Sequence, residues 1–122
     1  MISDDLRKRL ADFARRRERR VVGPFSKDLP CDWRPQNILN PESGMPFTDA
    51  SAWELIAERL ENGHPVRQQT LEKPPGAQAV VLEVDLGPTQ AILFVKIQIG
   101  AERVIGRSFH PSYEKRSGQK KR

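Results

Sequence analysis

Hydrophobic residues recur with helical spacing in residues 1–20. Their positions follow i, i+4, i+7 and i+8, which gives one narrow apolar stripe. Ser3 precedes the stripe as a candidate N-cap, and acids occupy the first turn, where they suit the helix dipole. The stripe consists of Leu6, Leu10, Phe13 and Ala14. We predict a helix that docks by its first half. Its basic end, residues 15–20, is either solvated or an arm that contacts RNA phosphates or an acidic partner.

A second helical pattern covers residues 48–62. Ser51-Ala52-Trp53-Glu54 has the form of a capping box, and Gly63 followed by Pro65 ends the pattern. Its apolar face, with spacing i, i+3, i+4 and i+7, consists of Trp53, Ile56, Ala57 and Leu60. We therefore predict a helix over residues 48–62 that buries this face in the core.

Strand patterns occupy the remainder of the chain up to residue 109. The breaks at Gly87–Gln90 and Gly100–Ala101 are short enough to join antiparallel neighbours. The four predicted strands are residues 66–71, 79–86, 91–99 and 102–109. Residues 21–47 contain five prolines, a density that prevents a helix or a central strand of useful length. This segment is nevertheless too apolar for a free linker, and we expect it to wrap over the body. The side chains expected to pin it are Phe25, Trp33, Ile38, Leu39 and Phe47.

These elements predict an α+β fold. Two helices pack on one face of a curved antiparallel sheet of three to four strands, and the Pro-rich segment wraps around them. The chain then divides into a basic N-terminal helix, a Pro-rich extended segment, an α+β core and a basic tail expected to be disordered. The corresponding ranges are 1–20, 21–47, 48–114 and 115–122.

The net charge of +5 is unevenly distributed over the 122 residues. Residues 1–20 hold eight bases and four acids, and residues 113–122 hold five bases and one acid, so each end carries +4 and the remainder −3. The basicity therefore describes the ends and not the body. The longest apolar run is far shorter than the ~20 residues of a membrane-spanning helix, and no signal peptide is visible. We expect a cytoplasmic protein without metal or cofactor, in which Cys31 is a structural or exposed thiol.

The last two predicted strands carry a cationic face. If Gly100–Ala101 is a two-residue hairpin loop, then Lys96, Gln98, Arg103 and Arg107 project together, and the apolar residues between them face the helices. A four-residue loop would leave the faces unchanged, whereas a three-residue loop would destroy the grouping. Fixed cations of this kind suit a phosphodiester. Charged residues on an exposed sheet face are also common without any function.

The residues after this face add acid–base groups. His110 can exchange protons near neutral pH, and Tyr113 can assist or stack on a base. RNA cleavage without a metal needs such a group beside cations that hold the phosphate. Strict alternation puts His110 with Ser108 on the face opposite Arg107 unless the chain twists at Pro111. His110 can also be a residue that merely ends a strand.

Two segments carry a resemblance to a known family. Phe94–Ile99 and Val104–His110 resemble the last two strands of bacterial toxin endoribonucleases of the RelE-like superfamily, with the nearest likeness to the motility quorum-sensing regulator (MqsR) type. In element order the resemblance covers residues 48–115. It implies helices on a curved antiparallel sheet, and RNA cleavage without a metal by basic and aromatic residues of that sheet. It also implies RNA or the ribosome and an antitoxin protein as partners.

The resemblance assigns roles to individual residues. Lys96 corresponds to a lysine of the penultimate strand and Lys115 to a lysine near the chain end. The expected catalytic residues are Lys96, Arg107, His110 and Tyr113, and the expected substrate-binding residues are Gln98, Arg103 and Lys115. The leading hypothesis is a toxin-like metal-independent endoribonuclease. The alternative is a non-catalytic RNA- or protein-binding module that uses its basic ends.

Overall fold

The computed structural model describes residues 2–23, 31–72 and 75–112, and its first element is helix α1, Asp4–Arg15. The Ser3 hydroxyl caps this helix by accepting the Leu6 N–H at 3.1 Å, as predicted. The apolar stripe ends at Ala14, and the helix ends one residue later. The basic residues that follow do not continue the α-helix. They form a 3₁₀ turn, η1 (Arg17–Arg19), and strand β1 (Arg20–Val22).

Helix α2 spans Asp49–Glu61, close to the predicted range. Its capping box begins three residues before the predicted one. The Thr48 hydroxyl accepts the Ser51 N–H, and the Ser51 hydroxyl accepts the Thr48 N–H. Ser51 fits this second role because its side chain is as short as that of Thr48 and reaches back over one turn. The predicted apolar face of the helix is fully buried.

The four predicted strands are confirmed as an antiparallel meander, and two further strands extend the sheet. The meander consists of β3 (Arg67–Thr70), β4 (Gln78–Val84), β5 (Leu93–Ile99) and β6 (Val104–Pro111). Strands β1 and β2 (Asp32–Trp33) both pair in parallel with β6. The described residues thus form a six-stranded sheet of order β1-β6-β5-β4-β3, with β2 also on β6. The α+β class is confirmed, and the sheet is wider than the three to four strands predicted.

The Pro-rich segment is held to the body partly by the side chains expected to pin it. Ile38 and Phe47 are buried, and Trp33 packs on the core. Leu39 is half exposed and does not pin the segment, because it lies at the start of the turn that Asn40 closes. Phe25 lies outside the described residues. A short 3₁₀ helix, η2 (Pro35–Asn37), connects β2 to the loop before α2.

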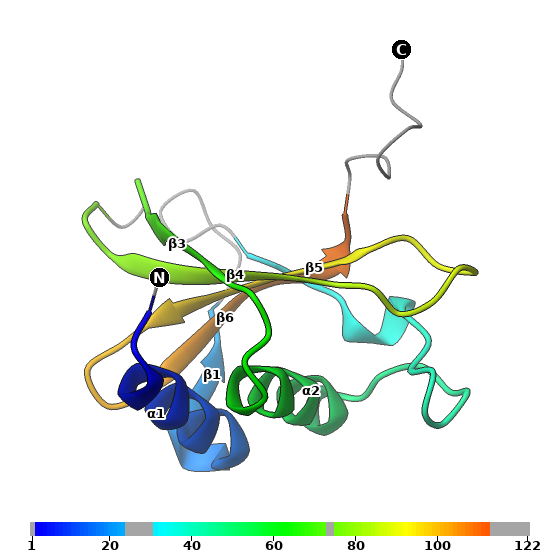
Figure 1. Ribbon diagram of the computed structural model, residues 1–122, viewed down its shortest axis with the longest axis horizontal. Helices are drawn as coiled ribbons and strands as arrows, with labels where there is room; N and C mark the ends of the chain where they lie inside the picture. Colours follow the sequence, from blue (N-terminus) through cyan, green and yellow to red (C-terminus); the bar gives the residue numbers. More distant parts are fainter. Residues whose placement is uncertain (1, 24–30, 73–74, 113–122) are drawn as a thin grey trace.

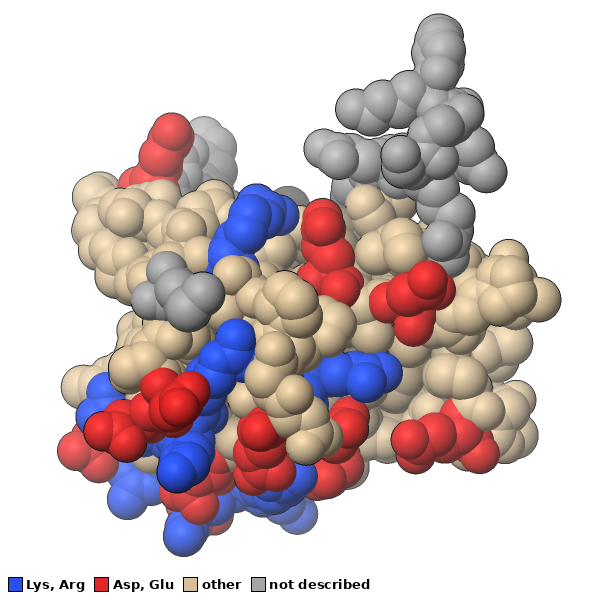
Figure 2. Space-filling model, viewed as in Figure 1, with Lys and Arg blue, Asp and Glu red and all other residues tan. Residues whose placement is uncertain are grey.

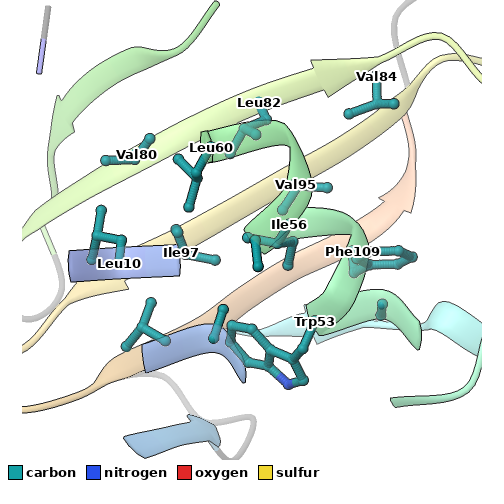
Figure 3. Packing of buried hydrophobic residues seen from close by; sticks show 14 of the residues in the cluster. Leu10, Trp53, Ile56, Leu60, Val80, Leu82, Val84, Val95, Ile97 and Phe109 are labelled. Carbon is teal, nitrogen blue, oxygen red and sulfur yellow. The ribbon is translucent and has the colours of Figure 1, made fainter. Parts of the chain in front are cut away.

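Both helices cover the same face of the sheet (Figure 1). Between the two layers lies one hydrophobic core, in which Trp53, Ile56 and Leu60 from α2 meet the inward side chains of the strands (Figure 3). The predicted inward residues Val95 and Ile97 belong to this core. Within the described residues no helix covers the opposite face of the sheet, and no helix is long and apolar enough to cross a membrane.

Candidate functional site

A β-bulge at Arg107 determines which side chains of β6 share the helix-free face. Ile97 pairs with Gly106 and Lys96 pairs with Ser108, so Arg107 is an additional residue in β6. One additional residue shifts the alternation of all later side chains by one position. The Arg107 side chain reaches Gln98 on the helix-free face. His110, three residues later, therefore lies on that face as well, opposite Phe94.

This register corrects two sequence predictions. The hairpin loop has four residues and not two, because Ile99 pairs with Val104. Arg103 consequently lies in the exposed loop and does not join the sheet face. Strict alternation also placed His110 and Arg107 on opposite faces of the sheet. This was wrong, because the bulge interrupts the alternation between them. Lys96, Gln98 and Arg107 do share the helix-free face, as predicted.

A depression of about 630 Å³ opens on the helix-free face. Two rows of paired positions cross it: Glu83, Phe94 and His110 in one row, and Val81, Lys96 and Ser108 in the next. The lining residues are Arg67, Glu83, Phe94, Lys96, Ser108, His110 and Ser112. Sequence reasoning did not single out Arg67, Glu83 or Phe94 as site residues. The period-two pattern of each strand contains them, and only the register between strands brings them together.

Lys96 lies at the centre of this depression and is partly buried. Burial lowers the pKa of Lys96, and the positive charges of Arg107 and Arg67 lower it further. The ion pairs and hydrogen bonds of the described residues do not include Lys96. Glu83 also lines the depression and pairs with Arg67 at 3.7 Å, so its carboxylate offsets part of this positive charge. A bound anion would relieve the repulsion that remains at Lys96, which makes Lys96 the best-placed anion-binding group of the depression.

Replacing Lys96 by methionine is expected to raise the melting temperature by a few degrees at neutral pH. The protonated amine costs stability, because folding desolvates it and brings it near two arginines. Since its pKa in the folded protein lies below the ordinary 10.5, this cost is present below the folded pKa and disappears as the pH rises toward 10.5. Thermal unfolding across this pH range checks the prediction. A difference between variant and wild type that does not shrink with rising pH would contradict it, and Lys8→Met on the exposed surface of α1 serves as the control.

Arg107 is buried and does not itself line the depression. Its side chain is 3% exposed and donates from Nη1 to Gln98 Oε1 at 2.6 Å. Its charge therefore acts on the site mainly through its field, as its effect on Lys96 indicates. Cys31 lies close by, and burial raises the pKa of its thiol although Arg107 partly opposes this. A thiol with a raised pKa is a poor nucleophile, in agreement with the expectation for Cys31.

His110 is held at the edge of the depression with a defined orientation. Its ring stacks on Phe94, with centroids 5.3 Å apart and planes 24° from parallel. Nδ1 lies 2.8 Å from the Pro111 carbonyl oxygen, which can only accept, so Nδ1 carries a proton. Nε2 lies 3.7 Å from Asp32 Oδ2. In this tautomer Nε2 presents a lone pair.

The basic N-terminal end is largely engaged within the fold. Arg15 pairs with Glu54 and Glu61, and Arg16 pairs with Asp12. Arg19 pairs with Glu102, whereas Arg7 and Arg20 donate to backbone carbonyls. Figure 2 shows the resulting mixture of basic and acidic side chains over the helical layer. This surface is thus of mixed charge and not a continuous basic arm.

The remaining predicted site residues, Tyr113 and Lys115, lie outside the described residues. Comparison with known proteins found no match to any family model, to any curated protein or to any solved structure. The site is therefore interpreted from its own residues.

Proposed function

We propose that the chain is a toxin-like, metal-independent endoribonuclease of a bacterial toxin–antitoxin system, as its resemblance to the RelE-like superfamily and the MqsR type implies. One observation carries the proposal. Lys96 and His110 line a single depression on the helix-free face, and the buried Arg107 lies close enough to lower the pKa of Lys96, so that positive charges suited to a phosphate adjoin an imidazole. The bulge at Arg107 supports this interpretation, because it is the feature that unites them.

The proposed reaction follows from the positions of these groups. The phosphate of an RNA chain binds over Lys96 and Arg67, and the positive charge of the buried Arg107 adds to their attraction. The 2′-hydroxyl loses its proton to solvent, and its oxygen attacks phosphorus. The bond from phosphorus to the 5′-oxygen breaks, and His110 gives the Nε2 proton to that leaving oxygen. The products are a 2′,3′-cyclic phosphate and a 5′-hydroxyl, and DNA is not cut because it lacks the 2′-hydroxyl.

Two partners and a compartment follow from the proposal. RNA, alone or on the ribosome, is the substrate, and an antitoxin protein would inhibit by covering the cationic depression. An acidic segment suits this role because it satisfies the same cations as a phosphate. Translation takes place in the cytoplasm, which is therefore the proposed location.

The test is cleavage of defined RNA by the purified full-length chain. Incubation of a single-stranded RNA and of the DNA of the same sequence, both in EDTA, should yield RNA fragments with 2′,3′-cyclic phosphate ends and intact DNA. Lys96→Gln should lower the rate by about a hundredfold, because it removes a cation from the transition-state charge. Lys8→Gln on the exposed surface of α1 is the matched control. RNA that stays intact, with growth unaffected on expression, would refute the enzymatic function.

The non-catalytic alternative predicts a different outcome of the same assay. RNA or an acidic protein would bind without cleavage, and Lys96→Gln would not weaken the binding. Neutralising exposed bases of the N-terminal end, such as Lys8, Arg9 and Arg17, would instead reduce both the affinity and its salt dependence. Charge substitutions are the appropriate test, since deletion of residues 1–20 would remove the buried residues of α1 from the core.

A further inference from the structure

The Pro-rich segment contributes a carboxylate to the helix-free face of the sheet. Strand β2 pairs in parallel with the second half of β6, with Asp32 opposite Ser108 and Trp33 opposite Phe109. Ser108 faces the depression and Phe109 faces the core. Because paired residues share a face, Asp32 lies on the helix-free face with Ser108, and Trp33 is directed to the core.

Trp33 fixes the position of Asp32 along the strand. Its ring packs against Trp53 and Phe109, with centroids 4.9 Å and 5.4 Å away. Its indole Nε1–H donates to Asp49 Oδ1 at 3.0 Å. Directly after β2, the Arg34 N–H donates to the Phe109 carbonyl oxygen at 2.8 Å. The backbone next to Asp32 is thus fixed by the packing of a partly buried indole and by a hydrogen bond to β6.

The Asp32 carboxylate lies between two basic side chains. Oδ1 pairs with Arg34 Nε at 2.5 Å, and Oδ2 lies 3.7 Å from His110 Nε2. The carboxylate is mostly buried, with a side chain that is 26% exposed. The contacts of His110 thus include Pro111 at Nδ1, Phe94 at the ring face and Asp32 near Nε2.

We propose that Asp32 is a positioning residue that orients the imidazole of His110 for proton transfer. The inference rests on the proposed function. Rotation of the ring by a half turn would exchange Nε2 with a carbon and bring a C–H group to the carboxylate. When Nε2 carries the proton that it gives to the leaving oxygen, the N–H edge attracts the carboxylate far better than a C–H edge does, and Asp32 thereby holds Nε2 at the edge of the depression. The Pro-rich segment is then part of the site and not only a cover for the body.

Kinetics of Asp32 variants test this role in the full-length chain. With a single-stranded RNA substrate, Asp32→Ala is expected to lower kcat by about tenfold to a hundredfold and to change KM little, because the cations that bind the phosphate remain. Asp32→Asn retains an acceptor of the same shape and should recover part of the loss. Glu72→Gln, in the exposed turn after β3, removes one carboxylate outside the depression and should cleave at the wild-type rate.

Histidine resonances test the orientation without reference to cleavage. The chain has only two histidines, so ¹³C- and ¹⁵N-labelled histidine gives separate signals for His110 and His64. Stacking on Phe94 shifts the ring protons of His110 through the ring current. In Asp32→Ala these signals should move toward those of an unstructured histidine, whereas the signals of His64 should not. The indole signal of Trp33 should also stay in place, since it reports that β2 remains docked.

The outcomes separate the two proposals. His110 signals that are unchanged in Asp32→Ala would overturn the positioning role whatever the RNA assay gives. Equal loss of kcat in Asp32→Ala and Asp32→Asn, with a displaced Trp33 indole signal, would also overturn it, because the effect would then come from undocking of β2. Suppose that the wild-type protein leaves RNA intact and that the His110 signals move in Asp32→Ala as expected. That result would refute the endoribonuclease function and leave the orientation of His110 by Asp32 in place.

Discussion

Replacing His110 by asparagine is expected to slow RNA cleavage by about 10²–10⁴-fold and to leave the fold intact. The asparagine amide can still donate to the Pro111 carbonyl, as Nδ1 of the imidazole does. It has no group that gives up a proton near neutral pH at the position of Nε2, so the leaving oxygen would depart without protonation. Single-turnover cleavage of a defined RNA measures the rate, and thermal unfolding checks the fold.

The second histidine provides the matched control for this prediction. His64 lies in the loop after α2, and its Nε2 lies 2.8 Å from the Glu83 carbonyl oxygen. His64→Asn shortens the side chain and gives up this backbone contact, but it removes no group that faces the phosphate. Its rate should remain within about twofold of wild type. Equal rates for His110→Asn and wild type would exclude His110 as the proton donor.

Much of the fold was predictable because burial of one face imposes a period on the sequence. The apolar face of α2, from Trp53 to Leu60, is buried as its spacing indicated. The strands of the meander follow from their alternating residues in the same way. Strands β1 and β2 have three and two residues, too few to display a period. Their pairing with β6 depends on tertiary contacts such as the packing of Trp33, which no local pattern encodes.

The site was predictable only in part, because it depends on the register of two strands. Lys96 and Gln98 lie on the helix-free face because the alternation of β5 is uninterrupted. In β6 the bulge at Arg107 interrupts the alternation. Gly106 directly before it is a residue type common at bulges, but a glycine in a strand is equally typical of a close backbone approach, so the sequence does not determine where the additional residue lies. Alternation alone therefore assigned His110 to the wrong face relative to Arg107. The contribution of Asp32 was not foreseen either, since it requires β2.

Replacing Gly106 by alanine is expected to lower the free energy of unfolding by about 2 kcal/mol, or roughly 6–10 °C in melting temperature. A Cβ at this position would lie 2.6 Å from the benzene ring of the Trp33 indole. The indole cannot move aside easily, because Trp53 and Phe109 pack against it. The conflict should therefore displace Trp33 and undock β2, which carries Asp32. RNA cleavage should fall in parallel with the stability, and thermal unfolding together with the RNA assay measures both.

A double-mutant cycle identifies the cause of this loss. Trp33→Leu alone should destabilise the protein through the lost aromatic packing and the lost hydrogen bond to Asp49. If the alanine methyl acts by striking the indole, Gly106→Ala should cost little more in the Trp33→Leu background, so that the two effects are strongly non-additive. Additive effects would mean that Gly106 is required for a reason other than the close approach of Trp33. In that case the docking of β2 would not depend on the absence of a side chain at residue 106, and the proposed link between this glycine and Asp32 would fail.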